Sequence, residues 1–344
     1  MDSSTSNFYL ISKTGTANKL ADLPATLKAL EVHDKGSYVW LDFAHPDKGQ
    51  LSLLVDPLGL HPLSIEDCLD ESQNPKLDDY PENSFLIFNT VDYFDHQLVV
   101  SELDIFISTH FLVTVRHDNG KPAFSQDLER YFSRNNENIK HGPAFLLHLL
   151  LDQVVDNKFT VIEALEDELN GAEEAILSDL PQFQPADLLH LRQDLLLLRK
   201  SLFHEREILV KICRLDCPYI GKTAIFFYRD IYDHLSKFFE LTESSRDIVT
   251  SLMEMYLSML NNEMAKAANE TNATVRRLTF ITTIFMPLSL LAGIGGMSEW
   301  SMITGPQNWK FTYPLFLLVM IILGVGNFYL LKWWEKKRKN DQND

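Results

Sequence analysis

The stretch that decides the fold is a pair of uncharged apolar runs: LTFITTIFMPLSLLAGIGGM at residues 278–297 and FTYPLFLLVMIILGVGNFYLL at residues 311–331. Each run has about the 20 residues that a helix needs to cross the hydrocarbon core of a bilayer. The short polar segment 298–310 separates them, and everything before Leu278 has the composition of a soluble protein. The sequence therefore predicts a large soluble region followed by one transmembrane hairpin. Because one hairpin cannot enclose an aqueous path, transport would require several copies around an axis.

The charges that flank the hairpin predict its orientation. Arg276 and Arg277 precede the first run, and KWWEKKRK follows the second at residues 332–339. Basic residues favour the cytoplasmic side, and paired tryptophans favour the membrane interface. We therefore expect a bacterial inner-membrane protein with both termini inside and 298–310 outside. Residues 1–19 lack the apolar core of a signal peptide, so we expect the hairpin itself to direct insertion.

Composition narrows the function. The chain has 48 Asp and Glu against 31 Lys and Arg, a formal charge of −17, which argues against nucleic acid as a partner. The charge is compatible with divalent cations, although acidic soluble domains are common. The three cysteines Cys68, Cys213 and Cys217 imply no disulfide framework. Cys213 and Cys217 have a spacing that allows a shared metal on a helix, but no convergent His or Cys is near in sequence, which favours free thiols.

The soluble region changes character along its length. Up to about residue 120, short runs at 37–43, 85–88, 103–107 and 111–115 have the alternation or β-branched and aromatic content of strands, the last two forming a hairpin across 108–110. A short helix is expected over 62–70, opened by Pro62. These patterns predict an α/β domain.

Long helices follow from residue 143. One is expected over 143–177, and a second carries a 3.5-residue leucine repeat from Leu188 to Ile212 that is interrupted at Glu205. No Pro or Gly occurs from 222 to 286, which predicts a third helix of about 65 residues, roughly 95 Å long, that runs into the first apolar run. Its apolar seam contains the small polar residues Thr242 and Ser245.

Hydroxyl groups distinguish the two apolar runs. The first contains four of them, at Thr279, Thr282, Thr283 and Ser289, which would either bond neighbouring helices or line a wet pore. The second, from Pro314 to Leu331, is almost purely lipophilic apart from Asn327 and is expected to form an outer, lipid-facing helix. An enzyme is not expected, because the chain has no Gly-rich phosphate loop or nucleophile elbow, and His45 and His61 beside prolines are typical of turns.

Several motifs together resemble one transporter family. They are LHPLSIEDC at 60–68 followed by Pro75 and Lys76, YRDIYDH at 228–234 followed by RDIV at 246–249, and LTFITTIFMPL at 278–288 running to GIGGM at 293–297. In order and spacing they resemble the CorA family of divalent-cation transporters, from about residue 23 to residue 337. The resemblance implies a funnel-shaped homopentamer in which the first membrane helix lines the pore and the second forms an outer ring.

The resemblance also implies roles for individual residues. The pore lining would comprise Asn272, Val275, Leu278, Thr279 and Met286. Asp230 would bind a regulatory metal between subunits, with Asp95 or Asp92 as the second such residue. The expected division is 1–142 for the cytoplasmic α/β domain, 143–277 for the helical stalk, 278–297 and 311–331 for the membrane helices, 298–310 for the outer loop and 332–344 for the basic tail.

One position departs from the family pattern. The family ends its first membrane helix with Gly-Met-Asn, whereas Gly296 and Met297 are followed here by Ser298. The asparagine ring holds a hydrated cation, and Mg²⁺ gives up its waters reluctantly. A serine ring would be wider and less selective. From the family resemblance we expect Mg²⁺ as the transported and regulatory ion, and the less selective ring would admit Co²⁺ or Ni²⁺ as further cargo. Zn²⁺ transport of the ZntB kind and a non-conducting metal-sensing scaffold stay open as alternatives.

Overall fold

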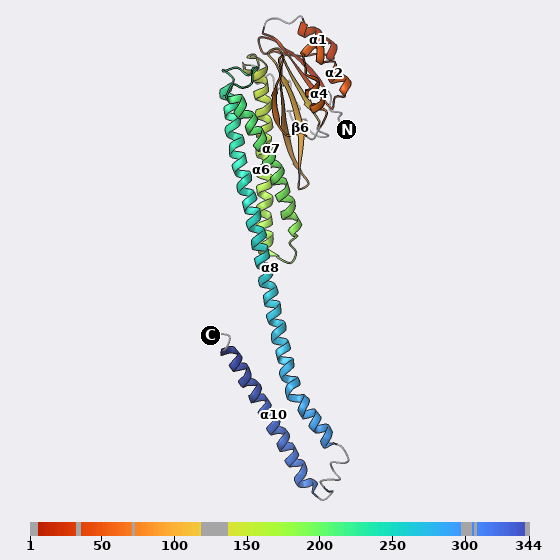
Figure 1. Cartoon of the computed structure of the whole chain (residues 1–344), viewed down its shortest axis with the longest axis vertical. Helices are drawn as coiled ribbons and strands as arrows, with labels where there is room; N and C mark the ends of the chain where they lie inside the picture. Colours follow the sequence, from red (N-terminus) through yellow and green to blue (C-terminus); the bar gives the residue numbers. More distant parts are fainter. Residues whose placement is uncertain are drawn as a thin grey trace. The chain divides into compact units, whose positions relative to one another are not determined.

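The computed structural model describes residues 6–31, 36–70, 73–117, 137–296, 305 and 308–340, the last segment with backbone alone at 309 and 335–340 (Figure 1). The chain divides into two compact units, Met1–Tyr256 and Leu257–Asp344. The first unit holds a seven-stranded sheet and its covering helices. The second holds the end of α8 (Ile225–Gly295) and α10 (Trp309–Asn340).

The sheet of the first unit has the strand order β2-β1-β3-β7-β6-β5-β4. Its strands are β1 (Asn7–Ile11), β2 (Ala17–Lys19), β3 (Tyr38–Ala44), β4 (Lys76–Asp79), β5 (Ser84–Phe94), β6 (Gln97–Ile107) and β7 (Phe111–Arg116). Neighbouring strands are antiparallel except β3 and β7, which run parallel. The four predicted strands correspond to β3, β5, β6 and β7, and the predicted hairpin joins β6 to β7. Strands β1, β2 and β4 were not predicted.

Residues alternate between the two faces of this sheet. One face packs under the short helices α1 (Leu23–Glu31), α2 (Lys48–Ser52), α3 (Val55–Leu58) and α4 (Pro62–Cys68). Its core includes Leu41, Phe106 and Val113 from the strands and Ile65 and Cys68 from α4. The other face packs against α6 (Pro143–Ser178) and α7 (Pro185–Cys213), so the sheet lies between two helical layers (Figure 1). Helix α4 begins and ends close to the predicted bounds, and His61 caps it through Nδ1, which accepts from the Leu63 N–H.

The long helices have the predicted bounds within a few residues. The α7 seam from Leu188 to Ile212 is buried, as its repeat predicts. On α8 the predicted seam is buried as far as Leu252. Thr242 and Ser245 on that seam donate their hydroxyls to the backbone carbonyls of Phe238 and Leu241, one turn earlier in their own helix. The polar seam positions are thus satisfied locally while the apolar ones bind the three helices together.

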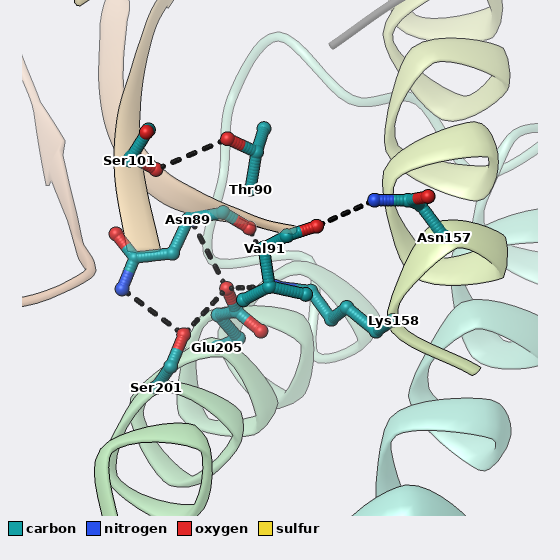
Figure 2. A network of polar contacts seen from close by, with 8 residues as sticks. All are labelled: Asn89, Thr90, Val91, Ser101, Asn157, Lys158, Ser201 and Glu205. Carbon is teal, nitrogen blue, oxygen red and sulfur yellow. Dashed lines mark hydrogen bonds and ion pairs between the residues drawn. The ribbon is translucent and has the colours of Figure 1, made fainter. Parts of the chain in front are cut away.

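A buried ion pair occupies the break in the α7 leucine repeat (Figure 2). Glu205 and Lys158 are both fully buried, and their charged atoms lie 2.9 Å apart. Glu205 also accepts from the Asn89 backbone N–H and the Ser201 hydroxyl, while Lys158 donates to the Asn89 carbonyl. Asn157 donates to the Val91 carbonyl. The network therefore joins strand β5 to both α6 and α7.

Candidate ion pathway and metal-sensing residues

The expected pore residues share one exposed face of α8. The side chains of Val275, Leu278 and Met286 are 54%, 64% and 70% exposed, and Asn272 and Thr279 are exposed as well. At about 100° per residue these five positions fall within an arc of about 120°. Among the described residues of this unit nothing covers this face, so lipid or another copy of the chain would have to cover it.

The opposite face of α8 is the one that α10 covers. Within the helix from 278 to 295, partial burial is confined to one stripe, formed by Phe280, Ile284, Pro287, Leu288, Leu291 and Gly295. A Cβ added at Gly295 would stand 2.7 Å from the Phe316 ring, and one added at Gly324 would stand 3.5 Å from Leu288. The centre of this stripe lies about 160° around the helix from the centre of the expected pore face. Helix α10 therefore leaves the expected pore residues uncovered.

Polar groups on the exposed face are held by the helix itself. The Thr279 hydroxyl donates to the Val275 carbonyl at 2.9 Å, and Thr282 donates to the Leu278 carbonyl. Pro287 lies inside α8 and has no N–H to offer the carbonyl one turn before it. Each threonine oxygen keeps lone pairs for a second partner, whether a neighbouring helix or water.

Asp230 lies on an acidic surface formed by α6 and α8. Its side chain is 69% exposed, and Oδ2 lies 3.8 Å from His234 Nε2. Across from it on α6, burial and the neighbouring charges of Asp156 and Asp230 raise the pKa of Asp152. Burial lowers the pKa of His148, and Asp230 opposes that shift. Of the residues on this surface, the sequence analysis named only Asp230, because its α6 neighbours lie about 75 residues earlier in the chain.

Asp92 and Asp95 lie elsewhere in the first unit, near the tip of the β5–β6 hairpin. Asp95 and His96 both have positive φ, 49° and 62°, and form the turn. His96 Nδ1 lies 3.3 Å from Glu168, and the Tyr93 hydroxyl contacts the same carboxylate. In the described part of one chain, neither aspartate joins Asp230 in a close set of ligand groups. A metal shared between subunits stays a prediction.

Comparison with known proteins decides the family. Residues 35–337 match the family described as CorA-like Mg²⁺ transporter protein. The chain belongs to the CorA family. It is 33% identical over 301 residues to YfjQ of Bacillus subtilis, covering 87% of this chain and 90% of that protein. It is 32% identical over 286 residues to the cobalt/magnesium transport protein CorA of Thermotoga maritima, covering 81% and 77%.

A solved structure confirms the fold. The complete structure of the CorA magnesium transporter from Methanocaldococcus jannaschii matches with a TM-score of 0.70 at 23% identity, covering 96% of this chain and 98% of that one. This CorA-family chain is accordingly a divalent metal ion transporter rather than an enzyme. Two of its described helices, α8 and α10, are long and apolar enough to cross a membrane, as predicted.

The family's hallmark position is only partly visible. The Gly296 N–H donates to the Ala292 carbonyl at 3.0 Å, so the helix hydrogen bonding reaches this residue. Met297 and Ser298 lie outside the described residues.

All three cysteines are free thiols. Cys217 is buried against the Ser84 hydroxyl at 3.5 Å, and it forms no close ligand set with Cys213 among the described residues.

Proposed function

We propose that this CorA-family transporter is a homopentameric channel for hydrated divalent cations, with Mg²⁺ as its main cargo and Co²⁺ as a second one. The face of α8 that holds Asn272, Val275, Leu278, Thr279 and Met286 would line the pore. Cytoplasmic metal bound at Asp230 would close it. In this proposal residues 1–142 and 143–277 form the cytoplasmic funnel, and 278–297 and 311–331 form the inner and outer membrane rings.

The observation that carries the proposal is the position of that face relative to α10. Apolar side chains at 275, 278 and 286 are more than half exposed, and they lie about 160° from the stripe that α10 covers. Five copies with α10 outermost would turn this face towards a common axis. Rings of apolar side chains can close such a pore by dewetting.

The chemistry of the face supports a hydrated ion. Asn272 and Thr279 offer an amide and a hydroxyl, whereas no Asp, Glu, His or Cys occurs from 278 to 297. Amide and hydroxyl groups hydrogen-bond to water, and Mg²⁺ keeps most of its waters when it binds. Zinc binds preferentially to sulfur and imidazole ligands, which are absent from this segment. The relative from Thermotoga maritima is named for cobalt and magnesium, which supports the same choice of cargo.

The charged flanks support an inside position for both termini. Arg276 and Arg277 precede the first membrane segment, and Lys332 begins the basic stretch that follows the second. The side chains of Trp333 and Trp334 are 60% and 67% exposed, as expected for residues that anchor a helix at the membrane interface. Residues 298–310 would then lie on the outer side of the membrane. We place the protein in the cell membrane of a bacterium.

Reconstitution of the full chain tests the proposal. Purified protein in liposomes that contain a Mg²⁺-sensitive dye should admit Mg²⁺ faster than empty liposomes, and Co²⁺ should compete. Parallel liposomes with a Zn²⁺-sensitive dye, with and without a pH gradient, distinguish the zinc transporter. Flux of Zn²⁺ alone, or no flux of any ion from correctly assembled protein, would contradict the proposal. Mass measurement of the detergent-solubilised complex checks the five-fold assembly independently.

A further inference from the structure

Three ligand-type side chains, Cys68, Asp104 and His117, meet at the end of helix α4 in the first unit, and Glu102 lies on the same face of the sheet as Asp104. Cys68 is the last residue of α4, Glu102 and Asp104 lie on β6, and His117 directly follows β7. Side chains alternate along β6, so Glu102 and Asp104 share the face of Phe106, which packs in the core under α4. The β6–β7 register, in which Asp104 pairs with Val115, brings Glu102 opposite His117, one step beyond the last pair of the ladder, Leu103 and Arg116.

The distances suit one metal ion. One ligand atom from each of Cys68, Asp104 and His117 lies within 4.8 Å of the other two. Asp104 Oδ2 and His117 Nε2 are 3.2 Å apart. Ligands at the usual 2.0–2.3 Å from a tetrahedral Zn²⁺ stand about 3.3–3.8 Å from one another. The histidine–aspartate pair already has nearly this spacing, and the thiol lies within 4.8 Å of both atoms.

In the described part of the chain, each of the two carboxylates in this cluster has one buried oxygen without the hydrogen bond that burial normally requires. Asp104 and Cys68 have no exposed surface, and only 8% of the His117 side chain is exposed. Asp104 Oδ1 and Glu102 Oε1 are buried without a hydrogen-bond donor among the described residues. Glu102 and Asp104 are two residues apart on the same face of β6, and both are at most 8% exposed. Two neighbouring carboxyl groups buried in this way require a shared proton or a bound cation.

We propose that Cys68, Asp104 and His117, with Glu102 as the fourth ligand, bind a Zn²⁺ ion inside each subunit. Thiolate and imidazole ligands select Zn²⁺ or Co²⁺ over Mg²⁺, which prefers six oxygen ligands. The bound ion would join α4 to strands β6 and β7 and so stabilise the α/β domain. The stability of this domain would then depend on the concentration of transition metal. This role is separate from the transported ion, because none of the four residues lies on the expected pore face.

The exposed edge of the cluster is on the side of His117. The His45 ring lies 6.5 Å from the His117 ring, and its backbone N–H donates to the Arg116 carbonyl. Arg116 itself pairs with Asp42 on the opposite face of the sheet, where its guanidinium contacts both carboxylate oxygens at 3.0 and 2.9 Å. Of these two neighbouring residues at the end of β7, the histidine is therefore the one directed to the cluster.

Cobalt spectroscopy on the full chain tests the site. Detergent-purified protein is stripped with a chelator and kept in millimolar Mg²⁺, so that oxygen-ligand sites are filled. Titration with Co²⁺ should then produce a thiolate-to-cobalt charge-transfer band in the near ultraviolet, saturating at one ion per subunit. Added Zn²⁺ should abolish the band and raise the midpoint of thermal unfolding. If the wild-type protein shows no such band, the proposal is wrong, and Glu102 and Asp104 share a proton instead.

Variants identify the ligands. Cys68→Ser should remove the band, and His117→Gln should weaken Co²⁺ binding by more than about 100-fold, since the loss of an outer-shell partner alone costs 10–100-fold. Cys213→Ser, a half-buried thiol outside the cluster, is the matched control and should keep the wild-type titration. A band that persists in Cys68→Ser, or that disappears in Cys213→Ser, would contradict the assignment. His117 lies at the edge of the cluster, so we expect His117→Gln to fold even if Cys68→Ser does not. Its Co²⁺ titration then still tests the site.

Discussion

Glu205 of α7 and Lys158 of α6 form an ion pair of 2.9 Å in which neither side chain has any exposed surface. Both charges are removed from water, so the loss of either partner would leave the other charge buried without compensation. Burial raises the pKa of Glu205, and the charge of Lys158 opposes that shift. Through Asn89 the pair also contacts strand β5, so it lies where the sheet and the first two long helices meet.

We expect Glu205→Gln to lower the free energy of unfolding by about 3–5 kcal/mol, because Lys158 would remain buried and uncompensated. Thermal and denaturant unfolding of the detergent-purified chain measures the change. Adding Lys158→Met should recover part of the loss, since no unpaired charge is then left. The exposed neighbour Glu207→Gln is the control and should stay within about 0.5 kcal/mol of wild type. A double variant less stable than Glu205→Gln alone would contradict this account.

The contact between Gly295 and Phe316 predicts a second effect. A Cβ at Gly295 would stand 2.7 Å from the ring, so Gly295→Ala should destabilise the α8–α10 hairpin by about 1–3 kcal/mol. The thermal midpoint of the purified protein should fall accordingly. Gly293→Ala is the matched control, because nothing lies within 4 Å of its added Cβ. Adding Phe316→Leu to Gly295→Ala should restore stability, and equal effects of the two single alanine variants would count against the contact.

The expected gate predicts a change in flux. Leu278→Ser places a hydroxyl in a ring that we expect to close by dewetting, so leak of Mg²⁺ at high internal metal should increase. Dye-loaded liposomes measure this leak. Ile281→Ser is the control, because Ile281 is 56% exposed but lies outside the arc of the expected pore residues. An unchanged or reduced leak in Leu278→Ser would exclude a gate at this position.

The acidic surface around Asp230 predicts metal-dependent protection. Bound divalent cations offset the repulsion between carboxylates, so millimolar Mg²⁺ should protect the soluble region from protease. Asp230→Ala should need several-fold more Mg²⁺ for the same protection. Asp233→Ala removes the same charge from another exposed position of α8 and should titrate like wild type. Identical titrations for all three proteins would remove Asp230 from the sensor.

Ser298 predicts a change in ion preference. Ser298→Asn supplies the amide that the family carries at this position, and amides hold the water shell of Mg²⁺ by donating and accepting. The variant should transport Mg²⁺ faster, or Mg²⁺ should compete with Co²⁺ at lower concentrations than in the wild type. Ser301→Asn, three residues further along the same loop, serves as the control. Equal selectivity in wild type and Ser298→Asn would remove this residue from the filter.

Local sequence patterns were sufficient for much of the fold. The helices α6, α7, α8 and α10 follow from apolar periodicity and from the absence of breakers, signals that depend on residues at most a few positions apart. The β6–β7 hairpin was predictable for the same reason. The turn at Asp95 and His96 was not, because neither residue is the glycine or asparagine that usually marks a positive-φ pair. Strands β1, β2 and β4 are short or mixed in polarity and carry no clear alternation.

The sequence by itself determined the membrane hairpin, the family motifs and the positions of the expected pore residues on one helix. Tertiary structure alone decided which side chains meet across the chain. Glu205 looked like a flaw in a leucine repeat until Lys158, 47 residues earlier, was found beside it. Cys68, Asp104 and His117 come from three separate elements. Periodicity describes contacts within one helix or strand, whereas these groups meet through sheet order and helix packing, which local spacing does not encode.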